Sequence, residues 1–516
     1  MKVLKIDSQD NVCVCLEDAK LGQTFTVDGA EITLVNDVPA GHKIALEDIS
    51  KGENVIKYGY PIGHAIENIG KGEWIHTHNV KTNLEGVLEY GYHPEQAAPE
   101  QDILYTPSST TFKGYRRSNG QVGVRNDLYI VPTVGCINQT AELIKQSFLR
   151  RNPDALKFFD NVIVIKHPYG CSQLGKDHAN TRDFLANTVL HPNAGAVLVV
   201  GLGCENNTIE VFRETLEKGA RGACGSLFNP ENSTQIDHSR IRFLIAQQAE
   251  DEVEAGADIL AELLDVVRGD TRSDIPISEL RVGLKCGGSD GFSGITANPL
   301  LGKLSDFLTA AGGTTILTEV PEMFGAETIL MNRARNRATF DKVVHLINDF
   351  KQYFIDANEV VYENPSPGNK AGGITTLEDK SLGCTQKAGS AKVVDVINYA
   401  DRVKVPGLNL LQSPGNDLVA ASALAVAGCH IVLFTTGRGN PFGTFVPTVK
   451  VASNPQLAAR KKSWIDFNAG RLLKETFEEV TPDFIDQVLR VASGEKTCSE
   501  QNGYSEVAIF KTGITL

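Results

Sequence analysis

Hydrophobic and polar positions follow two different patterns along the chain, and the change between them falls near residue 110. Residues 1–92 alternate short apolar stretches with turn signals such as Lys51-Gly52, a pattern that predicts a small, mostly β domain. Residues 93–110 are polar, contain prolines and lack an apolar period, so we expect them to form an exposed linker.

Beyond the linker, patterns of buried strands alternate with patterns of amphipathic helices. The apolar runs at residues 162–165 and 196–200 belong to this alternation, which is typical of a largely parallel sheet covered by helices. A polar stretch at residues 268–274 interrupts the pattern, and further strand-like runs follow it. We therefore predict an α/β protein in which the β domain precedes two α/β domains, residues 111–274 and residues 275–516, with largely parallel sheets.

Composition then excludes several classes of protein. The 516 residues carry a formal net charge of -13, which argues against a nucleic-acid partner because phosphate binding needs a dense basic surface. No apolar run is long enough to span a bilayer and no secretory pattern opens the sequence, so we expect a cytoplasmic protein without a membrane partner. The ten cysteines lack the dense spacing of a disulfide scaffold, so we expect reduced thiols, with metal ligation open to a few.

Three histidines of the β domain are candidates for metal and proton chemistry. His76 and His78 lie in a strand-like stretch, where residues two apart project from the same face, so they could share one divalent cation. His42 is a candidate third ligand or proton carrier. Two solvated histidines on a strand edge would produce the same pattern, and that alternative stays open.

Three cysteines of the central domain offer a different metal chemistry. Cys136, Cys171 and Cys204 each lie at or near a predicted strand end beside glycine, so three thiols from separate turns could converge. Such a set could hold an iron–sulfur cluster with one iron left open for substrate. None of the three belongs to a Cys-x-x-Cys pair, and buried inert cysteines are common, so we favour a mononuclear cation over a cluster.

Glycine-rich turns after later strands carry the side chains that we expect to contact a substrate. Ser289 and Asp290 lie in one turn, Asn416 and Asp417 in another, and Arg438 in a third. The guanidinium of Arg438 suits bidentate recognition of a carboxylate, and the other four side chains suit hydroxyl groups. The glycine motifs that bind nucleotides are missing from the sequence, which weakens any nucleotide-dependent interpretation.

A polar, glycine-rich run at residues 363–390 is long for a compact domain, and such segments survive mainly as functional loops or as disorder. Lys370, Lys380 and Lys387 could supply positive charge to an anionic substrate, and we assign Lys370 a catalytic or carboxylate-binding role. Asn369 is a candidate hydroxyl contact. A flexible surface loop would explain the same composition.

Several longer stretches resemble the altronate and galactarate dehydratase family. The similar segments are residues 286–299, residues 363–389 and residues 437–450, and residues 1–92 resemble the SAF domain of that family. The resemblance implies a hydro-lyase that converts D-altronate to 2-dehydro-3-deoxy-D-gluconate in hexuronate breakdown, activated by ferrous iron, Fe(2+), or manganese, Mn(2+). Galactarate dehydration and sulfolactate cleavage remain alternatives within the family, and a non-catalytic sugar-acid-binding protein remains one outside it.

Dehydration of a sugar acid sets the roles that these residues would play. The C2 proton next to a carboxylate is weakly acidic, so a cation must stabilise the enediolate while a base removes the proton and an acid assists the departing hydroxide. We assign the cation to His76 and His78, with His42 as third ligand or base. Because these histidines and Arg438 belong to different predicted domains, the site must form between domains or subunits, and we expect a homodimer.

Overall fold

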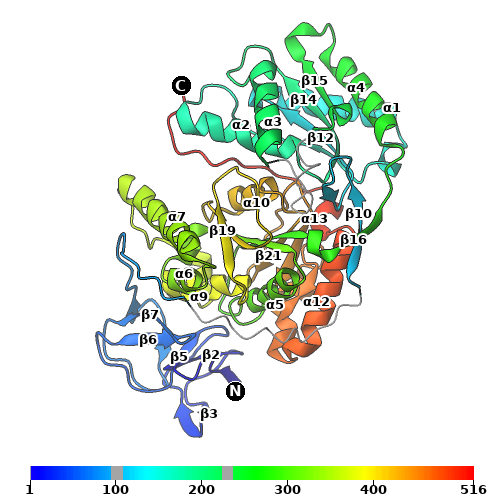
Figure 1. The fold of residues 1–516 in the computed structure, drawn as a ribbon. Helices are drawn as coiled ribbons and strands as arrows, with labels where there is room; N and C mark the ends of the chain where they lie inside the picture. Colours follow the sequence, from blue (N-terminus) through cyan, green and yellow to red (C-terminus); the bar gives the residue numbers. More distant parts are fainter. Residues whose placement is uncertain (1, 95–108, 224–235) are drawn as a thin grey trace.

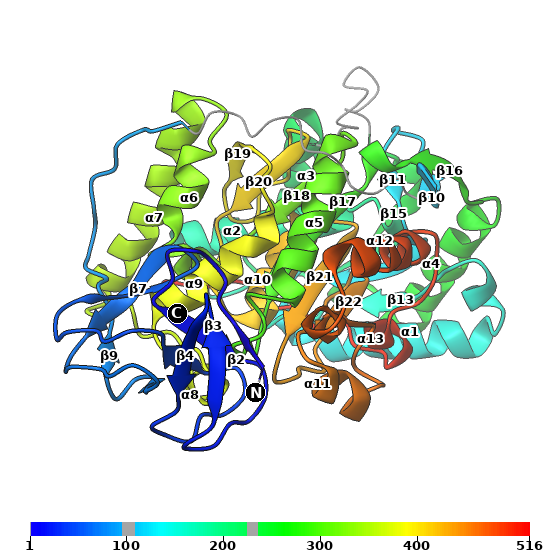
Figure 2. The same ribbon diagram turned by 90° about the horizontal axis from the view of Figure 1, so that it is seen from below.

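The computed structural model describes residues 2–94, 109–223 and 236–516, which form three parts (Figure 1). A small β domain, drawn in blue, lies beside α9 of the C-terminal part in both views (Figures 1 and 2). The central sheet and its helices, in cyan and green, lie at the opposite end of the molecule (Figure 1). In the described part of the chain, no helix combines the length and the apolar character needed to cross a membrane.

The N-terminal domain is built from antiparallel strands only. One sheet has the order β1-β2-β5-β8, a second has the order β6-β7-β9, and β3 pairs with β4 in a hairpin. The strands are β1 Val3–Leu4, β2 Val12–Cys15, β3 Thr24–Val27, β4 Ala30–Thr33, β5 Lys43–Ala45, β6 Asn54–Lys57, β7 Tyr60–Ala65, β8 Trp74–Ile75 and β9 Val80–Lys81. Their buried side chains form two small apolar clusters, one of which also includes Ala326 and Leu382 of the C-terminal part.

The central part contains a parallel sheet of order β13-β12-β14-β15, with α1 and α4 packed together on one apolar cluster and α2 and α3 on another. A smaller antiparallel sheet of order β11-β10-β16 lies next to it. The elements are β10 Thr111–Arg116, β11 Val122–Gly123, β12 Asp127–Pro132, α1 Asn138–Arg151, β13 Val162–Val164, α2 Gly175–Val189, β14 Ala194–Gly201, α3 Ile209–Ala223, β15 Ile241–Ile245, α4 Glu252–Val267 and β16 Ser273–Pro276.

The C-terminal part is organised around a parallel sheet of order β19-β20-β18-β17-β21-β22-β23. Its strands are β17 Arg281–Cys286, β18 Thr314–Leu317, β19 Val393–Ile397, β20 Gly407–Leu411, β21 Ile431–Thr436, β22 Thr448–Ala452 and β23 Phe467–Asn468. Its helices are α5 Ala297–Ala310, α6 Glu327–Asn332, α7 Arg337–Asp356, α8 Pro367–Ala371, α9 Leu377–Thr385, α10 Asp417–Val426, α11 Pro455–Arg460, α12 Phe477–Ala492 and α13 Cys498–Gln501. Short 3-10 helices include η1 Gly135–Ile137, η6 Val320–Met323 and η7 Gln386–Ala388.

The predicted fold class, a mostly β N-terminal domain followed by α/β domains with largely parallel sheets, is confirmed. The domain boundaries stay predictions. The expected boundary between residues 274 and 275 falls inside β16, which pairs with β10. Most of the expected linker lies outside the described residues.

The polar run at residues 363–390 is not the long loop that its composition predicts. It folds into α8, α9 and η7, and α9 is buried along its whole length. Thr376 caps α9 by accepting a hydrogen bond from the Asp379 amide, and Ser366 and Asn369 form a capping box on α8. Because its polar groups find partners inside the protein, a segment with little apolar content can lie in the interior.

Buried charges join the N-terminal domain to α9. Lys43 and Lys57 each donate to the Asp379 carboxylate, at 2.8 and 2.9 Å, and all three side chains are almost inaccessible to solvent. Burial alone would raise the pKa of Asp379, but the two ammonium groups outweigh it and hold this pKa well below its usual range. Glu378 extends the contact, because it accepts hydrogen bonds from the Thr82 hydroxyl and the Asn83 amide.

Glycines let the two backbones approach beside this ion pair, which gives a direct test of the interface. A Cβ on Gly291 would lie 2.0 Å from the Gly41 carbonyl oxygen, so Gly291→Ala should push the N-terminal domain away from the C-terminal sheet. A Cβ on Gly368, in nearby α8, meets nothing within 4 Å, so Gly368→Ala is the matched control. We expect faster proteolysis of the N-terminal domain in Gly291→Ala alone; equal rates in both variants would contradict the close contact.

Lys450 on β22 predicts a pH-dependent stability. Its side chain is fully buried, its Nζ lies 3.3 Å from the Phe434 ring centroid, and no hydrogen-bond partner for it exists among the described residues. Burial lowers the pKa of Lys450 to about 7, so across the window from pH 7 to 10.5 the unfolded chain holds a proton that the folded chain has released. Stability should therefore rise with pH through this window.

Folding below pH 10.5 costs free energy because Lys450 must release its proton. Lys450→Met removes this cost and should raise Tm by several degrees at pH 7, with the gain shrinking as the pH approaches 10.5. Lys342→Met, which removes an exposed lysine paired with Asp395, should change Tm little at either pH. Calorimetric scans at two pH values measure both. A gain for Lys450→Met that is the same at pH 7 and pH 10 would contradict the lowered pKa.

Candidate active site

The candidate site lies where the carboxyl ends of C-terminal strands meet the N-terminal domain. Residues from both sides line one small cavity: Lys57, Tyr58, Ser289, Asp290, Gly291, Ser293, Gly294, Asn298, Ile374, Asp379, Lys380, Gly383 and Cys384. In open α/β sheets, ligands bind outside the carboxyl ends of the strands, and the turn after β17 occupies that place here. A cavity between the two domains, where we expect the site, is therefore present within a single chain.

Three of the expected substrate contacts are engaged with the protein itself. The buried Asp290 carboxylate accepts hydrogen bonds from Ser293, Ser453 and Asn454, and it therefore holds two turns together. The Asn369 amide joins Ser289, Ser366 and Lys380. Asn416 caps α10 by accepting from the amides of residues 418 and 419.

Asp417 is partly exposed and shares contacts with two neighbours. Its carboxylate accepts from Lys285 Nζ at 2.8 Å and from Asn440 Nδ2 at 2.7 Å. One oxygen of this carboxylate therefore pairs with the buried Lys285 ammonium, while about a quarter of the side chain remains exposed. Asp417 can meet a bound hydroxyl group without giving up its interior partners.

Ser289, Lys370 and Arg438 keep polar groups available. The Ser289 Oγ is buried and has no hydrogen-bond partner among the described residues. Arg438 is exposed at the end of β21, where its backbone amide donates to the Gly288 carbonyl and fixes the turn. Lys370 is half-buried on α8. A hydroxyl, an ammonium and a guanidinium are suitable donors for an anionic, polyhydroxylated ligand.

The histidines are arranged differently from the expected strand pair. β8 ends at Ile75, and His76 to Asn79 form a turn closed by a hydrogen bond from the Asn79 amide to the His76 carbonyl. The Trp74 ring stacks on His76, with centroids 5.7 Å apart, and also contacts the exposed His78 ring, with centroids 5.1 Å apart. The prediction that His76 and His78 project from one face of a strand is therefore wrong.

His42 and His76, in contrast, lie together beside the segment that joins α8 to α9. Their ring centroids are 5.0 Å apart, and His76 Nδ1 lies 3.2 Å from the Thr375 hydroxyl. Burial, reinforced by the Lys43 charge, lowers the pKa of His42 to about 4 and that of His76 to about 3. Both rings are neutral at pH 7, the form in which an imidazole can bind a metal or accept a proton.

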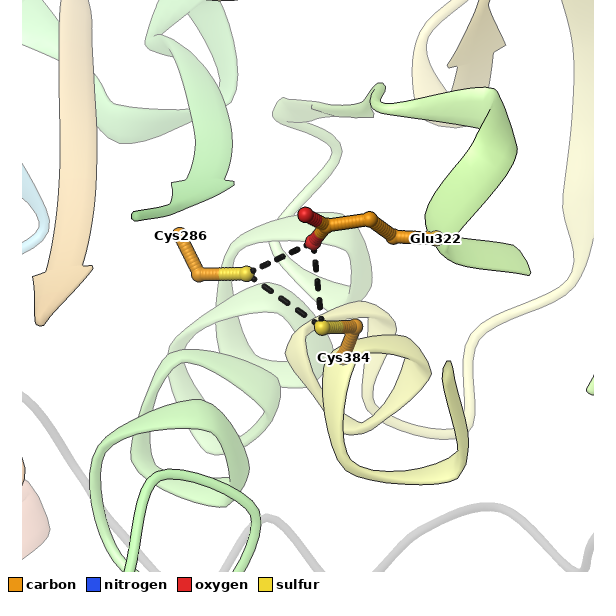
Figure 3. A group of neighbouring side chains, drawn as sticks. All are labelled: Cys286, Glu322 and Cys384. Atoms are coloured by element: carbon orange, nitrogen blue, oxygen red, sulfur yellow. Dashed lines mark hydrogen bonds between the residues drawn. The ribbon is translucent and has the colours of Figure 1, made fainter. Parts of the chain in front are cut away.

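A second group of possible metal ligands lies deeper in the site (Figure 3). Glu322 Oε2 lies 3.1 Å from Cys286 Sγ and 3.2 Å from Cys384 Sγ, and the two sulfurs are 3.3 Å apart. Cys286, Glu322 and Cys384 form a set of His, Cys, Asp or Glu side chains whose possible ligand atoms all lie within 4.8 Å of one another. Among the described residues, it is the one such set with at least three members. The histidines do not complete such a group.

The chemistry of these three donors fits a borderline divalent cation, since two sulfurs and a carboxylate oxygen are ligands that iron and zinc accept. Two lysines compete with the cation. Lys387 Nζ lies 2.9 Å from Cys286 Sγ, and Lys380 Nζ lies 2.8 Å from the other oxygen of Glu322. A hydrogen bond with Cys286 and burial raise the pKa of Cys384, so a metal would have to displace its proton.

Further buried charges surround this group. Glu319 accepts from Lys285 at 2.7 Å and from Lys387 at 2.8 Å, with all three side chains shielded from solvent. Glu319 adopts a left-handed backbone conformation, φ 69°, which is uncommon outside glycine and clusters at functional sites. Sequence reasoning missed Glu319 and Glu322, because isolated glutamates after a strand carry no distinctive spacing. The glycine-rich turn that begins at Cys286 was the available sequence signal for this part of the site, because Cys286 contacts Glu322.

Cys136, Cys171 and Cys204 are not part of this site. They belong to the central domain, where they follow β12, β13 and β14. Their thiols are exposed, half-buried and exposed, in that order.

Comparisons with known proteins agree with this architecture. Three family models match in succession: the altronate/galactarate dehydratase SAF domain over residues 1–83, the second domain of D-galactarate dehydratase/altronate hydrolase over residues 114–268, and the C-terminal domain of D-galactarate/altronate dehydratase over residues 277–515. The chain is 55% identical to altronate dehydratase of Escherichia coli (strain K12), with 100% of both chains covered.

Two further relatives show how far the similarity extends. Altronate dehydratase of Bacillus subtilis (strain 168) is 55% identical, with 99% of both chains covered. Galactarate dehydratase (L-threo-forming) of Escherichia coli (strain K12) is 32% identical, with 98% of this chain and 96% of the relative covered. The order of domains and the full-length similarity together show that this chain belongs to the altronate/galactarate dehydratase family.

Proposed function

We propose that this protein is a hydro-lyase that dehydrates D-altronate to 2-dehydro-3-deoxy-D-gluconate in hexuronate breakdown. The observation that carries the proposal is the cavity lined by both the SAF domain and the C-terminal sheet, in a chain similar over its whole length to altronate dehydratases. The identity to the galactarate enzyme is lower, 32% against 55%, which favours altronate as the substrate.

In the proposed mechanism, charged donors hold the carboxylate while neutral groups manage protons. Arg438 binds two carboxylate oxygens, and the unpartnered Ser289 hydroxyl binds a substrate hydroxyl. Lys370 is the proposed proton carrier at C2 or at the departing C3 hydroxyl. A divalent cation, when bound, would stabilise the negative charge that develops on the substrate carboxylate as C2 loses its proton.

We propose His76 as a ligand of that cation, with His42 and Trp74 as its positioning neighbours. His76 uses Nδ1 toward Thr375, which leaves Nε2 as the atom for a metal, and His42 Nδ1 accepts a hydrogen bond from the Trp74 indole at 3.1 Å. His78 remains the expected second ligand. The triad Cys286, Glu322 and Cys384 is the competing location, because its ligand atoms already converge.

A homodimer and a cytoplasmic location also remain proposals. The expectation of a dimer arose from a site divided between domains. In the structure, those domains meet within one chain through the ion pair of Asp379 with Lys43 and Lys57, so the site is lined without a second subunit.

The proposed reaction is tested by turnover of three sugar-acid or sulfonated substrates. Purified protein should release a 2-keto acid from D-altronate with a kcat/KM at least about tenfold above that for galactarate or sulfolactate, since a pocket that pairs every hydroxyl rejects mismatched analogues. Calorimetric binding of altronate without release of a keto acid would instead support a binding protein.

Arg438→Lys should weaken catalysis more than its conservative nature suggests. A lysine ammonium cannot reproduce the planar, two-pronged contact, so we expect kcat/KM to fall roughly tenfold to a hundredfold, mainly through KM. Arg337→Lys, at an exposed ion pair with Asp341 on α7, is the control and should leave both constants unchanged. If Arg438→Lys behaves like the control, Arg438 does not bind the carboxylate.

Removal of divalent metal should abolish turnover, and ferrous iron or manganese should restore it. The location of the metal is measured by manganese paramagnetic resonance on chelator-treated protein. His76→Ala should lose bound manganese and turnover together, whereas Cys384→Ala should keep bound manganese. The opposite result, manganese lost in Cys384→Ala alone, would move the cation to the Cys286, Glu322 and Cys384 triad.

A further inference from the structure

Three loops of the central domain bring cysteines to one edge of its parallel sheet. β13, β12 and β14 are neighbours in that sheet, and Cys171, Cys136 and Cys204 lie in the loops that follow them. Parallel strands point their carboxyl ends to the same edge, so all three loops lie on one side of the sheet. The loops that carry the three described cysteines of the central domain therefore lie at one edge of the sheet.

Direct hydrogen bonds join these loops beside each cysteine. The amide of Gly135, the residue before Cys136, donates to the Tyr169 carbonyl at 2.8 Å. The amide of Ser172, the residue after Cys171, donates to the Asn206 side chain at 3.0 Å. Cys136 is therefore tied to the loop of Cys171, and Cys171 to the loop of Cys204.

Buried side chains fix the shape of the loops. The Glu205 carboxylate accepts from the Thr133 hydroxyl at 2.6 Å and from the Gly203 amide at 2.6 Å, so it connects the Cys204 loop to the end of β12. His167 Nε2 lies 2.8 Å from the Pro132 carbonyl, and its Nδ1 accepts from the Tyr169 amide. Loops held by interior partners in this way present a preorganised set of ligands.

The three thiols differ from the packing cysteines of this protein. Cys13, Cys15 and Cys429 are buried in apolar clusters, as small hydrophobic side chains usually are. Cys136 and Cys204 are exposed, and Cys171 is half-buried. Packing in an apolar core therefore does not account for these three thiols, and Cys204 Sγ instead accepts a hydrogen bond from Gln247 Nε2 at 3.4 Å.

Unpartnered amide atoms point independently to a bound group. Near each of the three cysteines in sequence lies one buried side-chain amide atom for which the described residues offer no hydrogen-bond partner: Asn138 Oδ1 at the start of α1, and Gln173 Nε2 and Asn207 Oδ1 in the other two loops. Gln173 and Asn207 are themselves almost completely buried. A buried polar atom left unpaired is destabilising, so three such atoms in the segments that carry the cysteines call for an explanation.

We propose that Cys136, Cys171 and Cys204 bind an iron–sulfur cluster through three thiolates, leaving one iron without a protein ligand from this set. A single ion is disfavoured, because these three sulfurs do not form a group with ligand atoms within 4.8 Å of one another among the described residues. In a cluster, each thiolate binds a different iron, so the ligands stand farther apart. The site belongs to a different domain from His76 and Asp290, and it goes beyond the proposed function.

The test is anaerobic reconstitution of the full chain with ferrous iron and sulfide. The protein should become brown and retain iron and acid-labile sulfide in about equal amounts after desalting. Cys136→Ser, Cys171→Ser and Cys204→Ser should each lose colour and sulfide while circular dichroism shows an unchanged fold. Cys498→Ser, which alters a half-buried thiol of the C-terminal domain, is the control and should keep both.

Three results would overturn the cluster: a protein that stays colourless after reconstitution, iron retained without sulfide, or a disulfide between two of these cysteines in the anaerobically prepared protein. Turnover of altronate measured on the same samples separates this inference from the proposed function. A sample with cluster that shows no turnover even with added ferrous iron or manganese refutes the function alone, and one with turnover but without cluster refutes the cluster alone. Loss of colour and sulfide in the serine variants supports the cluster, whether or not turnover falls with it.

Discussion

The site depends on one buried carboxylate shared by two lysines. Asp379 on α9 receives Lys43 and Lys57 from the N-terminal domain, and none of the three has meaningful contact with solvent. Removing one partner of such a group leaves an uncompensated buried charge, which costs about 3–5 kcal/mol. The ion pair therefore selects one orientation of the N-terminal domain, and that orientation brings His42 and His76 to the end of α8 and to Thr375.

The same principle of paired interior charges continues through the C-terminal sheet. Lys285, Lys387 and Lys380 alternate with Glu319 and Glu322, so each ammonium has a carboxylate within 2.8 Å. The Cys286 thiol lies within this network. Three ammonium groups thus lie in the interior beside the candidate site, although the sequence as a whole carries a net charge of -13. Local charge, not net charge, is what a carboxylate meets.

Periodicity predicted the architecture well, because strand and helix patterns respond to burial and burial is decided by side-chain type. It failed at the run from residue 363 to residue 390, where polar side chains are buried by pairing with one another and with another domain. It also failed at His76 and His78, because a turn begins one residue after Ile75 and no residue type announces it. Glycine turns located Ser289 and Arg438 correctly at strand ends, whereas Glu319, Glu322 and Asp379 required the tertiary structure, since a single acidic residue gives no periodic signal.

The central claim is that substrate binds between the SAF domain and the C-terminal sheet of one chain. Amide hydrogen exchange measured with and without D-altronate tests it most directly, because it reports on both sides of the cavity at once. The structure predicts slower exchange in the N-terminal segment around Gly41 and His42 together with the segments around Ser289 and Thr375. Slower exchange on only one of the two sides, or only in the central domain, would contradict a site formed between them.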